Sequence, residues 1–166
     1  MVIFLEELDD ININEKIQKI FSDKKIKFKY VFKSNNENNT LTLGRIFAKY
    51  INIGDILTLN GELGSGKTVF VKGIGNHFNI QDEISSPTFT IVNEYTTNSF
   101  PIYHFDVYRL NDMYNFLETI GTDYFSKGPC FIEWGKNIEE ILPRNTIHID
   151  FEKIDENSRN ITIWRK

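Results

Sequence analysis

Eight consecutive residues of this sequence have the types and spacing of a phosphate-binding loop. Residues 61–68 read Gly-Glu-Leu-Gly-Ser-Gly-Lys-Thr, which matches the pattern G-x-x-x-x-G-K-[ST] in full. The glycines let the backbone wrap closely, so that its N–H groups and the N-terminus of the following helix face phosphates. Lys67 would reach the β- and γ-phosphates, and the Thr68 hydroxyl would supply an oxygen ligand to Mg²⁺. The loop predicts binding of a nucleoside triphosphate.

The segments on either side of the loop agree with this interpretation. Residues 56–59 form an apolar run that is typical of a buried strand, and residues 69–71 and 74 have the spacing of the buried side of a helix. A phosphate-binding loop connects a strand to a helix in this order. The context therefore favours a real nucleotide site over a chance match.

Two carboxylates could complete the site. Enzymes with such a loop need an acid at the end of a neighbouring strand to hold magnesium or its water, and a group that orients the attacking nucleophile. Two apolar runs end in an acid, residues 102–106 in Asp106 and residues 130–133 in Glu133. Either acid could instead be a helix cap or a surface charge. We treat both as candidate catalytic and metal-binding residues.

Three further residues have two interpretations each. The Thr88 hydroxyl could lie near the γ-phosphate in a switch segment, or residues 86–88 could form a simple turn. His104 shares a strand face with Asp106 and could hydrogen-bond within the site or lie in the core. Arg109 could compensate charge at the site, although an ion pair with a nearby carboxylate is the simpler expectation.

The elements that would position these residues alternate between strands and helices. A capping box at residues 34–37 predicts a helix to about residue 50, after an alternating strand at 28–33 whose lysines are typical of a charged sheet edge. We expect a terminal hairpin from residues 146–151 and 160–164. The other predicted elements are strands at 56–59, 90–95, 100–105 and 129–134 and helices at 111–120 and 137–142. This order predicts a three-layer α/β fold with a central parallel sheet flanked by antiparallel strands and hairpins.

Length and composition favour one domain. The 166 residues suffice for one well-buried core, so we expect a single phosphate-loop domain over residues 28–166. Residues 1–27 form an N-terminal extension of unknown role, packed on or beside the domain. Ile17, Ile20 and Phe21 could face inward from a short helix in it. The lysines at positions 24, 25 and 27 fit a solvated face.

The overall charge disfavours direct nucleic-acid binding. A net charge of −4 gives no basic surface for gripping RNA, so any role on RNA would act through partners. The first residues lack the basic and long apolar stretches of an export signal, and no run is long enough for a membrane span. We therefore expect a cytoplasmic protein without membrane association. Cys130, the only cysteine, fits a core position better than a nucleophile.

Four segments together carry a family resemblance. In chain order they are the loop at 61–68, Ser-Pro-Thr-Phe-Thr at 86–90, His-Phe-Asp-Val-Tyr-Arg-Leu at 104–110, and Glu-Trp at 133–134. From about residue 28 to residue 165 the sequence resembles the TsaE family, small bacterial ATPases of tRNA threonylcarbamoyladenosine biosynthesis. The resemblance implies ATP and Mg²⁺ as cofactors. It also implies TsaD and TsaB as partners, which transfer the threonylcarbamoyl group to the adenosine beside the anticodon of ANN-reading tRNAs.

The resemblance also implies roles for individual residues. Asp106 and Glu133 match the acids for magnesium binding and hydrolysis, and Thr88 matches a switch-like threonine. Trp134 matches an aromatic residue beside the acid. The implied nucleotide-binding set is Glu62, Leu63, Gly64, Ser65, Gly66, Lys67, Thr68 and Val69.

The sequence departs from the family pattern in a few places. Glu62 replaces the usual Asp and Ser65 the usual Ala, and both changes are mild. Gly135 stands where Pro or Ala is typical. The first 27 residues have no recognised counterpart and could alter partner docking.

Two alternative functions remain open at this point. One is a nucleotide-gated binding module, in which ATP orders residues 86–90 for docking and hydrolysis is incidental. The other is a small-metabolite kinase, since the loop alone does not distinguish water from another phosphoryl acceptor. GTP is disfavoured because no N-K-x-D segment follows the loop.

Overall fold

One mixed sheet organises the chain. The computed structural model describes residues 6–8, 12–110 and 112–166. Within these residues the strand order is β1-β2-β8-β7-β3-β6-β5-β4. The elements are β1 Glu6–Leu8, α1 Ile13–Ser22, β2 Phe28–Ser34, α2 Glu37–Ala48, β3 Ile56–Asn60, α3 Lys67–His77, β4 Val92–Tyr95, β5 Ile102–Asp106, α4 Met113–Thr119, the 3₁₀ helix η1 Asp123–Ser126, β6 Cys130–Glu133, the 3₁₀ helix η2 Gly135–Ile141, β7 Ile147–Lys153 and β8 Arg159–Arg165.

The centre of the sheet is parallel. Strand β3 lies between β6 and β7 and is parallel to both, and β5 is parallel to β6. Antiparallel strands flank this centre, with β4 beside β5 on one side and the β7–β8 hairpin followed by β2 on the other. The predicted α/β class and the predicted terminal hairpin are therefore confirmed.

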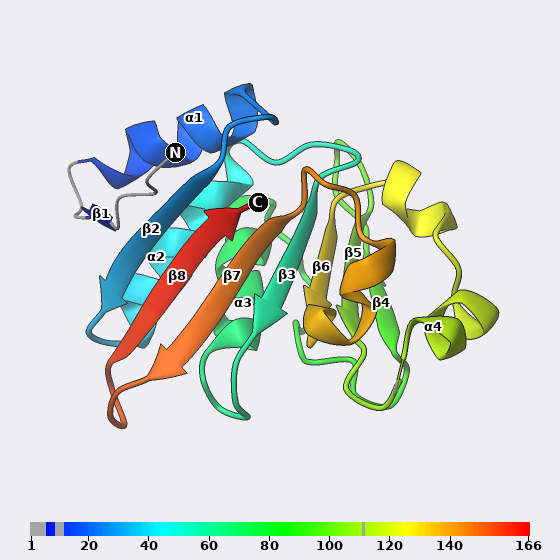
Figure 1. Cartoon of the computed structure of the whole chain (residues 1–166). Helices are drawn as coiled ribbons and strands as arrows, with labels where there is room; N and C mark the ends of the chain where they lie inside the picture. The colour runs from blue at the N-terminus through cyan, green and yellow to red at the C-terminus, as the bar shows by residue number, and fades with distance from the viewer. Residues whose placement is uncertain (1–5, 9–11, 111) are drawn as a thin grey trace.

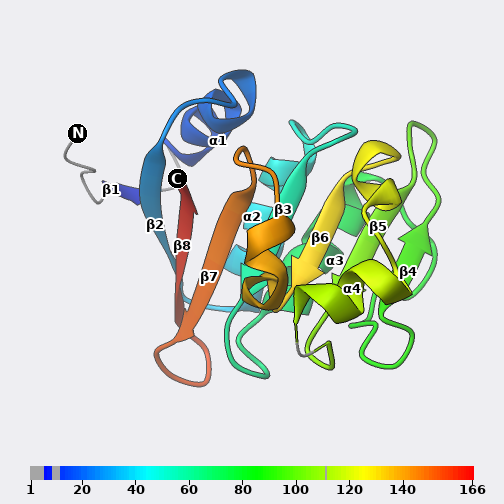
Figure 2. The same cartoon turned by 45° about the vertical axis from the view of Figure 1, so that its right-hand side comes forward.

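Helices cover both faces of the sheet (Figures 1 and 2). Helices α1, α2 and α3 lie on one face, where apolar strand residues pack with Leu43, Phe47 and Phe70 in the larger core cluster. Helix α4 and the two 3₁₀ helices lie on the other face, over a smaller cluster that contains Phe105 and Phe116. Strands β3, β5 and β6 thus have buried side chains on both faces, which explains their continuous apolar runs.

The carboxyl ends of the parallel strands meet at one edge of the sheet. Glu133, the last residue of β6, pairs in register with Leu59 of β3 and with Asp106 of β5. The loop that follows β3 begins at this same edge. The fold therefore brings together three segments that lie far apart in the sequence.

Some sequence predictions were wrong in detail. Helix α2 is capped by Asn36, whose side chain accepts a hydrogen bond from Asn39 N, whereas Ser34 belongs to β2 and bonds Thr40 with its hydroxyl. Strand β2 was predicted as an edge strand, but it is not one, because β1 pairs with it on its outer side. The segment predicted as a helix at 137–142 is 3₁₀ and begins at Gly135.

Helix α1 was predicted only in outline. Ile17 and Ile20 are buried in the larger core cluster and Phe21 packs against it, as the sequence indicates. Residues 1–5 and 9–11 of the predicted extension, and Asn111, the predicted start of the helix at 111–120, lie outside the described residues. The division into extension and domain stays a prediction.

Candidate nucleotide site

The phosphate-binding loop connects β3 to α3 in a conformation that only glycine adopts easily. Gly66 is the N-cap of α3 and has a φ of 108°, in the left-handed region. Gly61 also has a positive φ, and a Cβ added there would lie 2.5 Å from the carbonyl oxygen of Phe151. Backbone strain and a close approach therefore explain the glycines at these two positions.

Lys67 turns back over the loop. Its Nζ donates to the carbonyl oxygens of Gly61 at 2.7 Å and Glu62 at 2.9 Å, and it lies 4.8 Å from the centre of the Trp134 ring. Burial lowers the pKa of Lys67, and the carboxylates of Glu133 and Asp106 oppose that shift. A phosphate group would give this buried ammonium charged oxygen acceptors in place of neutral carbonyls.

Glu133 links the loop to the strand ends. Its Oε1 accepts hydrogen bonds from Thr68 Oγ1 at 3.0 Å and from His104 Nε2 at 2.9 Å. Among the described residues Oε2 has no hydrogen-bond partner, and Glu133 is only 3% exposed. One oxygen of this carboxylate is fixed, while the other is free for a water or a cation.

His104 satisfies both of its sequence interpretations. The side chain is fully buried, and it hydrogen-bonds within the site. Because the Glu133 carboxylate only accepts, Nε2 carries the proton in this hydrogen bond. The other ring nitrogen, Nδ1, is buried without a partner in the described part of the chain.

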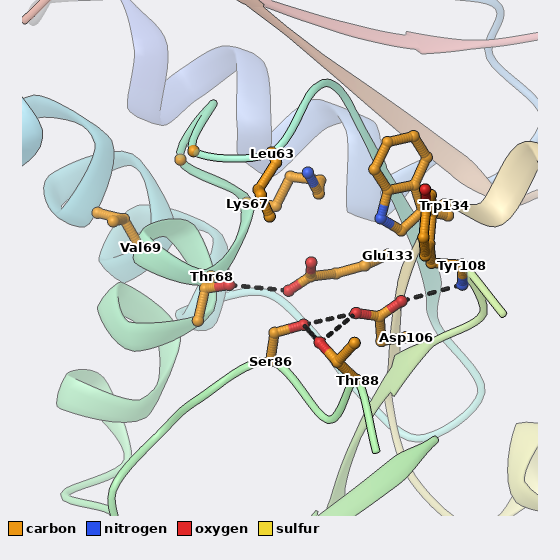
Figure 3. A pocket seen from close by; sticks show the side chains of 12 residues that line it. Leu63, Lys67, Thr68, Val69, Ser86, Thr88, Asp106, Tyr108, Glu133 and Trp134 are labelled. Atoms are coloured by element: carbon orange, nitrogen blue, oxygen red, sulfur yellow. Dashed lines mark hydrogen bonds between the residues drawn. The ribbon is translucent and has the colours of Figure 1, made fainter. Parts of the chain in front are cut away.

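Asp106 holds the segment that follows α3. Its Oδ2 accepts from Ser86 Oγ at 2.7 Å and from Thr88 Oγ1 at 3.0 Å, and its Oδ1 accepts from Tyr108 N at 2.9 Å (Figure 3). Thr88 begins a turn, as one sequence interpretation expected, and it also lies at the site, bonded to a carboxylate.

Ile91 is the last residue of this segment, which spans residues 86–91. It has a φ of 67°, which is rare for a β-branched residue because the branched Cβ crowds the backbone. Its N–H donates to Pro87 O at 2.7 Å, and its carbonyl accepts from Asp106 N at 2.9 Å. Residues 86–91 are thus attached to the end of β5 through both the side chain and the backbone of Asp106.

These groups surround a cavity of about 440 Å³. This volume lies within the range of small-molecule sites, about 300–1,000 Å³. Figure 3 shows the side chains from the loop and from the ends of β5 and β6 pointing toward one another. The lining residues are Leu63, Gly64, Gly66, Lys67, Thr68, Val69, Ser86, Thr88, Asp106, Tyr108, Glu133 and Trp134.

Two residues of the implied nucleotide-binding set do not line the cavity. Ser65 is buried and its hydroxyl has no partner in the described residues, and Glu62 contributes only its carbonyl, to Lys67. Conversely, sequence reasoning gave no role to Ser86 or Tyr108, although both lie in the segments that carry the resemblance. Arg109 stacks on the Phe89 ring at 4.6 Å and has no carboxylate partner among the described residues.

Cys130 does not line the cavity of the candidate site. It is fully buried in β6, and burial raises the pKa of its thiol to about 12. A thiol that stays protonated is a poor nucleophile. The structure supports the prediction of a core cysteine.

The oxygen donors suit magnesium. Mg²⁺ takes oxygen ligands, keeps several waters, and is usually bound through one or two carboxylates together with substrate phosphates. The Thr68 hydroxyl and the free oxygen of Glu133 meet this description, and Asp106 lies on the adjacent strand. In the described residues no group of three His, Cys, Asp or Glu side chains could hold a metal by itself.

The fold and the loop define a P-loop nucleotide-binding protein. A family model described as "Threonylcarbamoyl adenosine biosynthesis protein TsaE" matches residues 34–161. The chain belongs to the TsaE family.

Individual relatives agree with this membership. Two relatives are named "tRNA threonylcarbamoyladenosine biosynthesis protein TsaE". The one from Bacillus subtilis is 40% identical to this chain, and the match covers 76% of this chain and 80% of that protein. The one from Treponema pallidum is 36% identical, and the match covers 78% of this chain and 96% of that protein. The solved structure described as "Crystal structure of Bacillus subtilus YdiB" is 33% identical, with a TM-score of 0.71 over 84% of this chain and 87% of that one.

None of the helices in the described ranges combines the length and the apolar character that crossing a bilayer requires.

Proposed function

We propose that this protein binds and hydrolyses ATP with Mg²⁺ and that this activity supports the threonylcarbamoylation of tRNA. The observation that carries the proposal is the convergence of Lys67, Thr68, Asp106 and Glu133 on one cavity. A basic residue, a hydroxyl and two strand-end carboxylates are the groups that phosphate-loop hydrolases use. The proposal assigns the transfer of the threonylcarbamoyl group to TsaD and TsaB, which act with this protein in the cytoplasm.

Each side chain has a distinct role in this proposal. Backbone N–H groups of residues 62–68 and the Lys67 ammonium bind the phosphates. Thr68 and Glu133 hold Mg²⁺, which neutralises charge on the phosphate oxygens when it is bound. The free Oε2 of Glu133 is the oxygen that would contact the cation or its water, while Oε1 stays fixed by His104. Asp106 keeps residues 86–88 at the edge of the site.

The test compares two carboxylates in an ATPase assay. Glu133→Gln removes the acceptor charge within the site, and Glu94→Gln alters an exposed glutamate on β4 as the matched control. We expect turnover that is low for the protein alone, rises with TsaD and TsaB, and falls about 100-fold or more in Glu133→Gln, as for loss of one preorganised catalytic group. ATP binding should persist in that variant. Unchanged turnover in Glu133→Gln would remove this role from the residue.

One observation supports a second candidate, a nucleotide-gated docking module. Ser86 and Thr88 are bonded directly to Asp106, so nucleotide at the site could change the position of residues 86–91. Phe89, in the same segment, is 84% exposed and available to a partner. This candidate predicts that partner binding depends on ATP even when Glu133→Gln abolishes hydrolysis. Binding to TsaD and TsaB that is identical in wild type and Lys67→Ala would count against it.

A further inference from the structure

A second hollow lies at the opposite edge of the sheet from the phosphate-binding loop. It has a volume of about 390 Å³. His148, near the start of β7, lines it, and β7 runs parallel to β3, whose far end carries the loop. Leu142 and Pro143, which follow η2, line it as well. This hollow is therefore separate from the candidate nucleotide site.

The charges around this hollow do not balance. Three cations line it, Lys27, Arg144 and Lys166, with a single carboxylate, Glu139. Glu139 already pairs with Lys166. Within the described residues neither Lys27 nor Arg144 has an ion-pair partner. Two uncompensated cations thus face one concavity in a chain whose net charge is −4, and a concave site of one sign concentrates counter-ions.

His148 and the ends of β2 and β8 beside the hollow are held in place. His148 is 7% exposed, its Nδ1 lies 2.9 Å from Thr58 Oγ1, and its ring stacks on Trp164 at 4.1 Å. Arg165 donates to the carbonyls of Ile20 and Asp23, which fastens the last strand to the end of α1. Because Phe28 pairs with Arg165 in register, Lys27 and Lys166 emerge from neighbouring strand ends. The cations are long side chains on a fixed backbone.

We propose that this hollow binds a phosphate group, carried by a small phosphorylated molecule or by an RNA backbone. Arginine offers planar paired donors and lysine a point charge, and both are common phosphate ligands. The volume exceeds that of a single ion and leaves room for an attached sugar or base. Lys27 and Lys166 lie outside residues 34–161, so the site is built partly by the flanks of this chain beyond the family match. Lys27 then has a function beyond a solvated face.

The experiment follows the Trp164 indole and His148 imidazole signals by NMR. Inorganic phosphate and a short oligoribonucleotide without terminal phosphates are titrated separately into the full chain carrying Lys67→Ala, which disables the first site. The double variant Lys27→Ala/Arg144→Ala tests the hollow. The control Lys33→Ala/Lys153→Ala removes two exposed lysines at the opposite ends of β2 and β7.

We expect one of the two probes to shift both signals, with an affinity that falls about tenfold or more in the Lys27/Arg144 variant and is unchanged in the control. A response to inorganic phosphate identifies a small phosphorylated ligand, and a response to the oligoribonucleotide alone identifies an RNA backbone. The proposal is overturned if neither probe shifts the signals at millimolar concentration. Equal weakening in the control, which indicates general charge attraction, overturns it as well.

Discussion

His104 Nε2 lies 2.9 Å from Oε1 of Glu133, the same oxygen that accepts from Thr68. A fully buried imidazole therefore fixes the orientation of the carboxylate at the end of β6. Under the proposed function, this contact keeps Oε2 directed to the cavity when Thr68 turns to a cation. His104 is then a positioning residue, not one that touches substrate.

Replacing His104 should separate turnover from binding. We expect His104→Phe to lower kcat by about 10- to 100-fold, the range seen when a partner that orients a ligand is removed, with little change in ATP affinity. His104→Gln, whose amide N–H can donate to Glu133, should restore part of the rate. Steady-state kinetics with separate nucleotide-binding measurements check this. A parallel loss of affinity and rate in both variants would indicate a merely structural role.

Gly66→Ala should weaken nucleotide binding by about tenfold or more. The residue has a φ of 108° at the start of α3, and an added Cβ would lie 3.4 Å from Cδ of Arg159. The left-handed conformation costs about 1–2 kcal/mol for an alanine, so the loop should relax away from its binding shape. Gly121→Ala is the matched control, since its φ is 74° and it lies after α4, outside the cavity. Both variants should lose stability in urea, while only Gly66→Ala loses ATP affinity by calorimetry.

The smaller core should depend strongly on Phe116. This side chain is fully buried and packs near Phe105 and Phe125. Phe116→Ala should lower the free energy of unfolding by about 3–5 kcal/mol, through lost burial and the cavity left behind. Tyr114, on the same helix, is 66% exposed. Tyr114→Ala should change stability by about 0.5 kcal/mol or less, and urea unfolding curves of the two variants would be compared.

Acid should destabilise the fold through His148. Burial lowers the pKa of His148; Glu139 and Asp150 oppose this shift, and Lys166 and Lys136 add to it. The folded state therefore favours the neutral ring. As the pH drops below the ordinary histidine pKa of about 6.5, His148 takes up a proton in the unfolded chain before it does so in the folded one. The free energy of unfolding therefore decreases as the pH decreases.

Unfolding in urea at several pH values between 5 and 8 measures this contribution. His148→Gln should flatten the pH dependence relative to wild type. His77→Gln, which removes an exposed histidine, is the matched control. Identical slopes in wild type and His148→Gln would contradict the prediction.

Local sequence patterns determined much of the fold. The apolar runs that end in Asp106 and Glu133 predicted two buried strands, because parallel central strands are covered on both faces. The alternation at 146–151 and 160–164, with a polar turn between them, predicted the β7–β8 hairpin. The loop predicted its own position between a strand and a helix. In each case the signal is local, since periodicity and turn chemistry act within a few residues.

Helix ends were harder to predict, because local signals can allow more than one capping residue. Ser34 and Asn36 both have side chains that can cap a helix, and the sequence does not say which one the chain uses. Strand β2 extends through Ser34, whose hydroxyl donates to the carbonyl oxygen of Asn36 and also hydrogen-bonds Thr40, so Asn36 caps the helix. Sheet pairing decided the helix start.

The sequence by itself determined that this chain has a phosphate-binding loop and two acids at strand ends. Only the tertiary structure decided that Glu133 bonds Thr68 and His104, that Asp106 holds Ser86 and Thr88, and that Lys27 and Arg144 line the same second hollow. The residues of these pairs are 18 to 117 positions apart. No local pattern encodes such distances, because strand order and register, set by packing of the whole core, bring the segments together.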